Sequence, residues 1–414
     1  MHKPRRRPPA PPRSPILRRG IVRIPAEVAI RVRAGHPWVF RDALGGRQLS
    51  EPVGAVLEVT DSKGNFIGRA LFDPDGAIAL RVFSRRPEER LDGPYLHARV
   101  EAARRRREAL LDLSALTALR VFAGESEGLP GVTVDRYADY LVAQFFSAAT
   151  LHFREPLYDA LAETWQPRGI YEQHRLRPLS GQGPRGPATL ARGQLAPVDL
   201  EVREEDARFL VDVTAPQNVG LFPDLREGRR AVRRLAAQKR VLNLFSYTGA
   251  FSVAAALGGA AQVVAIDVSA KWHARARQNL ICCGLDPEQN KEYFSEDVFK
   301  MLAQLRGRGR SFDLAIVDPP TFSQAHGRVF TALRDWAELG EEVLSVLAPG
   351  GLLLACSNTV KLDALDLERA LGEAAARARA RLEVVGRIGL PPDFPVAAGF
   401  PEGHYLKCAL AVRE

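Results

Sequence analysis

Short apolar segments interrupted by turn residues dominate the chain from residue 20 to 90. Val, Ile, Leu and Phe alternate there with polar residues, and the breaks are rich in Gly, Pro and Asp, as in Asp61-Ser62-Lys63-Gly64. Alternation bounded by such turns predicts strands joined by hairpins. We therefore expect a small β-barrel over 20–90, with strands at 28–32, 53–60, 66–72 and 78–83.

Residues 91–200 mix helical and strand periods, which predicts a central α+β domain. The expected elements are helices at 97–113 and 151–165 and strands at 131–134 and 140–146. A Gly- and Pro-rich stretch at 177–187 indicates a loop or linker.

After residue 201 the pattern changes to buried strands that alternate with amphipathic helices. This alternation is typical of a doubly wound, mainly parallel sheet with helices on both faces. We expect an α/β, Rossmann-like domain over 201–414. Its predicted strands are 240–245, 262–267, 312–318, 351–356, 382–390 and 405–412, and its predicted helices are 250–257, 270–282, 298–305, 330–347 and 365–379.

Composition limits the class of protein. The 414 residues are 46% hydrophobic, which excludes global disorder. Four cysteines, none in a C-x-x-C pair, argue against a disulfide framework and a thiolate zinc site, so no metal is expected. No apolar run is long enough to cross a bilayer and the N-terminus lacks an apolar signal core. We expect a soluble, cytoplasmic protein.

The net charge of +9 is unevenly distributed. Residues 1–19 contain six arginines, one lysine, six prolines and no acid. We expect a disordered arm, which is either a solvated tail or a phosphate-seeking arm for nucleic acid. Arg104 to Arg107 form a second basic cluster on an expected helix, where some of the four side chains face solvent or a polyanion.

Ligands of open α/β sheets bind beyond the carboxyl ends of the strands, so the residues that follow each predicted strand are the candidates for a binding site. The segment 243–251 follows the first strand and has Gly249 as its one glycine, which favours a nucleoside without phosphates over a dinucleotide. Asp267 ends the second strand, where a carboxylate can accept hydrogen bonds from ribose hydroxyls. Asp297 follows as a candidate for an adenine amino group, or as a helix cap only. Asp318 begins an Asp-Pro-Pro run after the fourth strand.

In this order, the motifs over 241–322 resemble class I S-adenosylmethionine-dependent methyltransferases, in particular the bacterial 23S ribosomal RNA methyltransferases that join an N-terminal PUA domain to a Rossmann-like catalytic domain. Residues 35–40 and 64–68 are similar to the PUA region of that family. Residues 218–226 resemble its motif before the first strand, and 400–407 match its closing motif.

The resemblance implies S-adenosyl-L-methionine as cofactor and large-subunit ribosomal RNA as partner. It places Tyr247, Thr248 and Gly249 at the methionine end of the cofactor, and Asp318 between the cofactor and the target base. The full set of implied cofactor residues is Phe222, Asp224, Arg226, Asn243, Tyr247, Thr248, Gly249, Asp267 at the ribose, Asp297 at the adenine, and Asp318.

The acceptor atom is left open. The best-known members of this family make 5-methylcytosine by adding a cysteine thiolate to carbon 6, and Cys356 at a strand end is the candidate nucleophile. The chain departs from the family here, because the second cysteine of those members falls on Asn358. A Ser-Asn pair is closer to members that methylate a guanine nitrogen, for which Asn358 and Asp318 would orient the base without covalent catalysis.

The leading hypothesis is an RNA methyltransferase acting on a base of 23S ribosomal RNA, at cytosine C5 by resemblance or, alternatively, at a guanine nitrogen. The substitution at Asn358 motivates a second hypothesis, a non-catalytic RNA-binding or ribosome-assembly protein. A small-molecule methyltransferase is a third hypothesis, which gives the barrel and the basic arm no function. No membrane partner is expected, and the sequence indicates no oligomeric state.

Overall fold

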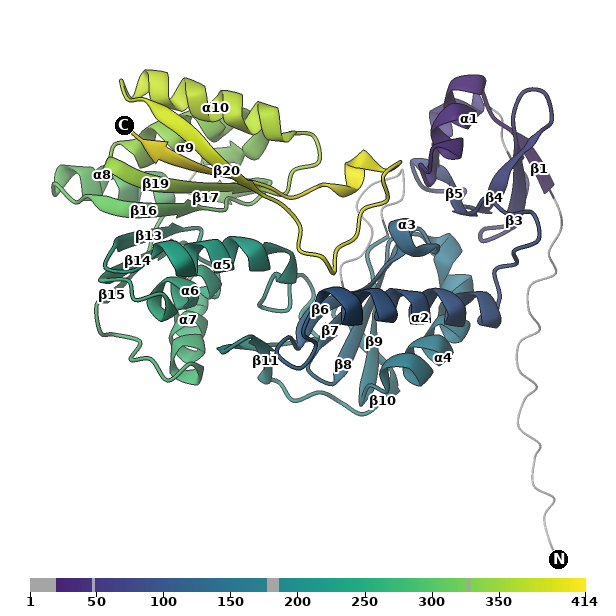
Figure 1. Cartoon of the computed structure of the whole chain (residues 1–414), viewed down its shortest axis with the longest axis horizontal. Coiled ribbons are helices and arrows are strands. Elements are labelled where there is room, and N and C mark those ends of the chain that lie inside the picture. The colour runs from purple at the N-terminus through teal and green to yellow at the C-terminus, as the bar shows by residue number, and fades with distance from the viewer. Residues whose placement is uncertain (1–19, 47–48, 177–185, 326–327) are drawn as a thin grey trace, which may run out of the picture.

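The computed structural model describes residues 20–46, 49–176, 186–325 and 328–414. These residues form an N-terminal barrel, a central α+β body and a larger C-terminal body, and the central body contacts the other two (Figure 1). The arm expected at 1–19 and most of the linker expected at 177–187 lie outside the described residues.

The N-terminal body is a five-stranded sheet in the order β1-β3-β4-β5-β2. Its strands are β1 (Gly20–Arg23), β2 (Trp38–Phe40), β3 (Val56–Thr60), β4 (Phe66–Phe72) and β5 (Ile78–Ser84). The strand predicted over 28–32 is wrong, because these residues belong to helix α1 (Ala26–Arg33). Ala29 and Val32, three residues apart, face the core while Ile30 is exposed, which is the spacing of a helix face rather than of a strand.

The central body is a second five-stranded sheet, in the order β10-β9-β8-β7-β6. Helices α2 (Gly93–Leu110) and α4 (Arg154–Trp165) pack on one of its faces, in a core that includes Phe83 of the barrel. The strands are β6 (Ala118–Ala123), β7 (Val132–Tyr137), β8 (Tyr140–Phe145), β9 (Gly169–His174) and β10 (Thr189–Gly193). The predicted elements correspond to α2, β7, β8 and α4, whereas β6, β9 and β10 were not predicted.

A small hairpin, β11 (Leu200–Glu204) and β12 (Ala207–Val211), connects the central body to the C-terminal one. Its apolar side chains Val202, Phe209 and Val211 are buried between Tyr171 of the central sheet and Leu280 of the C-terminal body. The two bodies therefore share a continuous core.

The C-terminal body carries a seven-stranded sheet in the order β15-β14-β13-β16-β19-β21-β20. The first five strands run parallel, and β21 is antiparallel to both of its neighbours. The mainly parallel α/β sheet predicted for this region is confirmed. The strands are β13 (Arg240–Leu244), β14 (Gln262–Asp267), β15 (Lys291–Ser295), β16 (Phe312–Val317), β19 (Leu347–Ser357), β20 (Leu382–Ile388) and β21 (Lys407–Arg413). Two short strands, β17 (Phe322–Ala325) and β18 (Arg328–Thr331), form a hairpin after β16.

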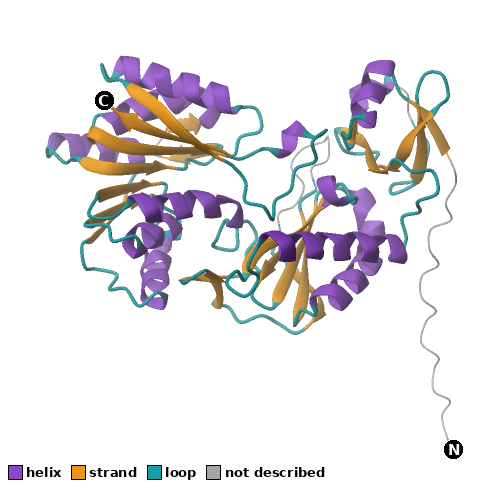
Figure 2. Ribbon diagram, in the orientation of Figure 1, coloured by secondary structure: helices purple, strands orange, loops and turns teal. Residues whose placement is uncertain are grey.

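Helices cover both faces of this sheet (Figure 2). One core holds side chains of α8, α9 and α10, and the core on the opposite face holds side chains of α5 and α6. The helices are α5 (Arg226–Leu235), α6 (Ala250–Leu257), α7 (Ala270–Cys282), α8 (Val298–Gly307), α9 (Ala332–Leu344) and α10 (Ala364–Arg377). Neither these nor any other helix among the described residues is long and apolar enough to cross a membrane.

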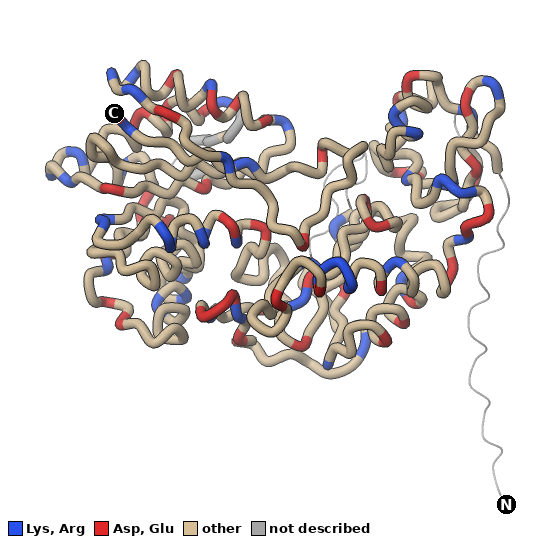
Figure 3. The backbone as a smooth tube through the Cα atoms, viewed as in Figure 1, with Lys and Arg blue, Asp and Glu red and all other residues tan. Residues whose placement is uncertain are grey.

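The arginine cluster on α2 is largely engaged within the protein. Arg107 is only 2% exposed and forms a buried ion pair with Glu127, which Arg106 also contacts at 2.6 Å. Arg104 and Arg105 pair with Glu108 and Glu101 one turn away on the same helix. Basic and acidic residues are similarly interspersed along the rest of the described chain (Figure 3). The cluster thus holds the helix and its surroundings together, and three carboxylates compensate most of its four positive charges.

Candidate active site

Four strand ends of the C-terminal sheet meet at one edge. The register pairs Leu244 with Ile266 and with Val317, and Val317 with Ala355, so β14, β13, β16 and β19 end side by side. The turn after β13, Asp267, Asp318 and Asn358 follow directly on these ends. The structure therefore gathers the predicted strand-end residues along one line, as expected for an open parallel sheet.

Asp267 is held by backbone amides. Its Oδ2 accepts a hydrogen bond from the Tyr247 amide at 2.9 Å, and its Oδ1 accepts one from the Ser269 amide at 3.0 Å. Tyr247 donates from a left-handed turn with φ of 47°. Because each carboxylate oxygen can accept a second hydrogen bond, the fixed carboxylate fits a ribose diol.

Gly249 closes that turn with φ of 77°. A Cβ at this position would come within 2.5 Å of the Cβ of Ala276, so only glycine lets α6 begin this close to α7. Thr248 secures the turn by donating from Oγ1 to the carbonyl of Gly220 at 2.6 Å. Asn243 is 1% exposed and donates to Ser252 Oγ at 2.9 Å, so it supports the turn from below.

Asp297 is the N-cap of α8, where its Oδ1 accepts a hydrogen bond from the Lys300 amide at 3.1 Å. The capping role considered for it is therefore present. The cap occupies Oδ1, and the contact of this residue with an adenine stays a prediction.

Two carboxyl groups, those of Asp224 and Asp318, interact electrostatically at this edge of the sheet. Asp224 Oδ2 accepts a hydrogen bond from the Tyr405 hydroxyl at 2.8 Å, while its Oδ1 is buried and has no hydrogen-bond partner among the described residues. Burial, together with the negative charge of Asp224, raises the pKa of Asp318 to about 7. Burial also raises the pKa of Asp224, and the Tyr405 hydrogen bond and the charge of Arg120 act in the opposite direction. Such a pair is stabilised by a bound cation.

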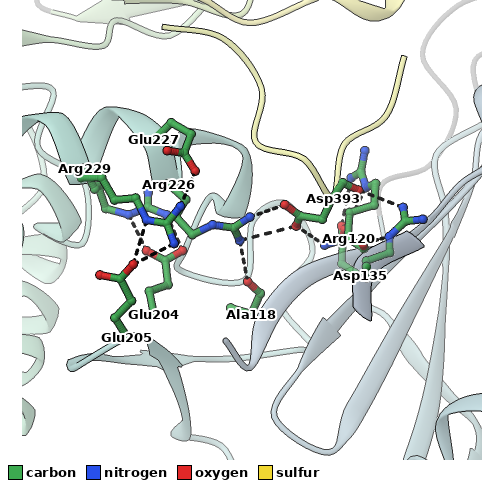
Figure 4. A network of polar contacts seen from close by, with 11 residues as sticks. Ala118, Arg120, Asp135, Glu204, Glu205, Arg226, Glu227, Arg229 and Asp393 are labelled. Carbon is green, nitrogen blue, oxygen red and sulfur yellow. Dashed lines mark hydrogen bonds and ion pairs between the residues drawn. The ribbon is translucent and has the colours of Figure 1, made fainter. Parts of the chain in front are cut away.

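Arg226 lies apart from this pair, in contrast to the cofactor contact expected for it. Its guanidinium is buried in an ion pair with Asp393 and donates to the Ala118 carbonyl at 3.4 Å (Figure 4). Asp393 also accepts from the Arg120 amide at 3.0 Å, and its carbonyl accepts from Arg107 at 2.9 Å. Arg226 therefore joins the C-terminal body to the central body.

Asn358 is exposed at the end of β19. Its Oδ1 accepts a hydrogen bond from Thr321 Oγ1 at 2.9 Å, which leaves the amide NH2 group to donate outward. Lys407 donates from Nζ to the carbonyl of Thr359 at 2.6 Å and so fixes the backbone beside Asn358.

Cys356, the candidate nucleophile, is fully buried. It packs with Leu225, Phe251 and Leu354 beneath α5 and α6, opposite Cys408 on β21. A hydrogen bond with Cys408, together with burial, raises the pKa of the Cys356 thiol well above its usual range. A nucleophilic cysteine needs an accessible thiolate, and this environment favours the thiol.

Two adjoining cavities open from the site. One, of about 780 Å³, is lined by Phe222, Asp224, Thr321 and Asn358 from the C-terminal body and by residues of the central body. The other, of about 890 Å³, also contains Asn358 and extends to Trp38 and Arg81 of the barrel. The residues shared by both cavities are Arg120, Phe146, Arg175, Leu176, Asn358, Val360 and Phe394. All three bodies therefore contribute to one continuous lining.

Several of these residues were missed at the level of sequence. Thr321 follows the Asp-Pro-Pro run and Tyr405 lies in the closing motif over 400–407. The resemblance did not imply a role for either side chain. Arg120 and Phe146 come from the central body, where the sequence pattern carried no chemical signal. Within the described ranges, no three His, Cys, Asp or Glu side chains are grouped as a metal site requires.

Comparison with known proteins identifies the class. The model of the S-adenosylmethionine-dependent methyltransferase family matches residues 155–404, and a model of PUA-like domains matches residues 22–85. The chain therefore belongs to the S-adenosylmethionine-dependent methyltransferases, with a PUA-like domain at its N-terminal end. The predicted fold class, cofactor and enzyme class are confirmed.

Individual relatives extend over nearly the whole chain. It is 34% identical to ribosomal RNA large subunit methyltransferase I of Escherichia coli, over 90% of this chain and 94% of that protein. It is 33% identical to the protein of that name from Photobacterium profundum, over 91% of this chain and 95% of the relative. The crystal structure of SMU.776 complexed with SAH has the same fold, with a TM-score of 0.86 at 23% identity over 95% of this chain and 100% of that one.

Proposed function

We propose that this methyltransferase modifies a base of large-subunit ribosomal RNA. The observation that carries the proposal is the lining that runs from Asp224 and Asn358 to Trp38 in the PUA-like barrel. A small substrate would need only the first cavity, whereas a nucleotide within a longer strand needs room for its neighbours. Aromatic side chains in this lining, such as Trp38 and Phe146, are suited to stacking on bases. The two relatives named above are large-subunit ribosomal RNA methyltransferases.

The residues of this chain fit S-adenosyl-L-methionine. The fixed carboxylate of Asp267 suits a ribose, and the unpaired Oδ1 of Asp224 suits a cationic group. The left-handed turn at Gly249 leaves no glycine-rich cradle for phosphate, which the cofactor does not carry. When bound, the cofactor supplies an electrophilic methyl group on a sulfonium.

The arrangement supports methylation of a guanine nitrogen better than thiol-dependent methylation of cytosine C5. Asn358 offers NH2 donors to the edge of a base, and Thr321 keeps that amide in one orientation. Asp318 can accept a hydrogen bond from the nitrogen that is methylated. As the nitrogen takes the methyl group, the bond from the methyl carbon to the sulfonium sulfur would break and leave a neutral thioether. The nitrogen would then lose its proton, and a carboxylate with a pKa of about 7 is well matched to take it. No step requires the buried thiol of Cys356.

The decisive experiment is methyl transfer from labelled S-adenosyl-L-methionine to large-subunit ribosomal RNA from cells that lack this chain, followed by nucleoside mass spectrometry. We expect the label in a methylated guanine. Label in 5-methylcytosine that disappears in Cys356→Ala would overturn the assigned acceptor. A protein that binds the cofactor but leaves such RNA unlabelled would overturn the RNA methyltransferase proposal and favour a binding role.

A further inference from the structure

We propose that Tyr405 is a positioning residue for the cofactor site, and that it orients Asp224 from a segment anchored on the PUA-like barrel. This segment is the β20–β21 connection (residues 389–406), which leaves the sheet after Ile388 and returns at Lys407. The inference rests on the proposed function, because it concerns the same site. It assigns a role to Tyr405 through its hydrogen bond to Asp224.

The contact is specific to a hydroxyl group. Tyr405 Oη donates to Asp224 Oδ2 at 2.8 Å, and that bond fixes which oxygen of Asp224 stays unpaired. The backbone of Tyr405 is held in turn, since its carbonyl accepts a hydrogen bond from Lys407 Nζ at 2.8 Å. A phenylalanine would keep the ring and lose only the donor.

The β20–β21 connection is anchored at both of the other bodies. Near its start, buried Asp393 pairs with Arg226 and accepts from the Arg120 amide of the central sheet. Further along, the ring of Phe400 lies 4.6 Å from that of Trp38 on the barrel. Glu402 Oε1 lies 3.1 Å from the Nε2 of His36.

Gly399 makes the tightest of these barrel contacts. A Cβ there would lie 2.1 Å from the carbonyl oxygen of Ala34, at the end of α1. The connection therefore touches the barrel through backbone as well as side chains, and Tyr405 follows only six residues later. Displacement of the barrel would be transmitted along this short stretch to the hydroxyl that orients Asp224.

The charges around Asp224 define a readout for this role. Burial raises the pKa of Asp224, Asp135 acts in the same direction, and Asp318 interacts with it electrostatically as a second carboxylate. The Tyr405 hydrogen bond opposes this shift, as do the positive charges of Arg120 and Arg229. Loss of the hydroxyl should therefore leave Asp224 protonated to higher pH, and binding of a cation should need a higher pH.

The test is Tyr405→Phe in the full-length chain, with the dissociation constant of S-adenosyl-L-methionine measured by calorimetry between about pH 6 and 9. No RNA is present, so the result is independent of whether ribosomal RNA is the substrate. We expect roughly tenfold weaker binding at pH 7, the size expected for a hydrogen bond to a charged group, and a pH dependence displaced to higher pH. Tyr158→Phe is the matched control, since Tyr158 donates to Glu172 at 2.6 Å in the central body.

The outcomes separate positioning from a general structural effect. A Tyr405→Phe profile that coincides with the parent at every pH would overturn the proposal. Binding that is weaker by the same factor at every pH would also overturn the proposal. A general structural effect of the substitution lowers affinity without changing the pKa of Asp224. A second variant, Phe400→Leu, removes the aromatic contact with Trp38 and should show a smaller displacement in the same direction. The opposite direction would refute the link to the barrel.

Discussion

Carboxylates at the cofactor edge and carboxylates at the junction between bodies have opposite environments. At the junction, Asp393 pairs with Arg226 and Glu204 pairs with Arg229, and all four side chains are buried (Figure 4). At the proposed cofactor edge, Asp224 and Asp318 interact electrostatically, neither forms an ion pair with an arginine among the described residues, and the pKa of each is raised.

The difference follows from what each carboxylate has to do. A buried charge without compensation is costly, so a structural carboxylate is paired with an arginine that satisfies its lone pairs. A carboxylate that receives a cationic ligand must keep its lone pairs available. Until the ligand binds, the unpaired carboxylate destabilises the folded protein. A raised pKa thus separates Asp224 and Asp318 at the proposed site from Asp393 and Glu204, which are paired with arginines in the scaffold.

The largest effect is expected at the junction. Arg226→Met leaves Asp393 as an uncompensated buried charge, which should lower the free energy of unfolding by about 3–5 kcal/mol. Urea unfolding followed by circular dichroism measures it. The double variant Arg226→Met/Asp393→Leu should recover much of that loss, and an equally unstable double variant would contradict the pairing argument.

At the proposed cofactor edge, replacing a carboxylate should lower methyl transfer and leave the stability of the fold unchanged. Asp318→Asn should lower methyl transfer by about 100- to 1000-fold, because the proton acceptor is lost. Its melting temperature should not fall, since a repulsive charge is removed beside Asp224. Asp313→Asn is the matched control at the other end of β16, where the carboxylate pairs with Arg240 at 2.8 Å. Comparable loss of activity in both variants would remove the special role of Asp318.

The pH dependence of cofactor binding sharpens the contrast. Asp318 has a pKa of about 7 in the folded chain, against an ordinary value of 3.8. Its protonation therefore stabilises the folded protein without ligand, fully below about pH 4, and this stabilisation is lost as the pH rises through 7. A cationic ligand binds the ionised form. Affinity for S-adenosyl-L-methionine should therefore fall by up to about tenfold per pH unit below pH 7. Calorimetry measures this, and Asp318→Asn should remove the part of the pH dependence that Asp318 contributes and leave the part that Asp224 contributes.

The smallest effect is expected beneath the site. Cys356→Ala removes a fully buried side chain from the core under α5 and α6, which should lower the free energy of unfolding by about 1 kcal/mol. Methyl transfer should remain within about twofold of the parent, given that a neutral buried thiol takes no part in proton transfer. Complete loss of transfer with normal cofactor affinity would restore the thiol mechanism.

Positions that depend on sheet topology could be predicted from the sequence. Asp267 and Asp318 were recognised because buried strands of a parallel sheet end at one edge, whatever packs around them. The helix α1 was mistaken for a strand because five alternating residues fit either period, and the choice depended on which side the rest of the barrel occupied. Strands β6, β9 and β10 were missed for a related reason, since pairing within the central sheet stabilises them, β6 with β7, β9 with β8 and β10 with β9.

The sequence could not distinguish the roles of side chains that lie two positions apart in one motif. Asp224 and Arg226 belong to one motif, yet one faces the cavity and the other pairs with Asp393, which lies 167 residues away in the chain. Cys356 and Asn358 are two residues apart, yet the last ladder pair is Ser357 with Lys407, so Asn358 projects beyond the sheet while Cys356 stays under the helices.

The sequence by itself determined the class of protein, since the strand-end motifs that carry the family resemblance are local properties that survive any detail of packing. The same resemblance determined the PUA-like domain, and the place of the cofactor along the sheet edge stays a prediction. Only the tertiary structure decided which carboxylates are neutralised, which thiol is accessible and how Tyr405 reaches Asp224. Charge compensation and burial depend on distance in space, and the β20–β21 connection sets those distances by bringing three bodies together.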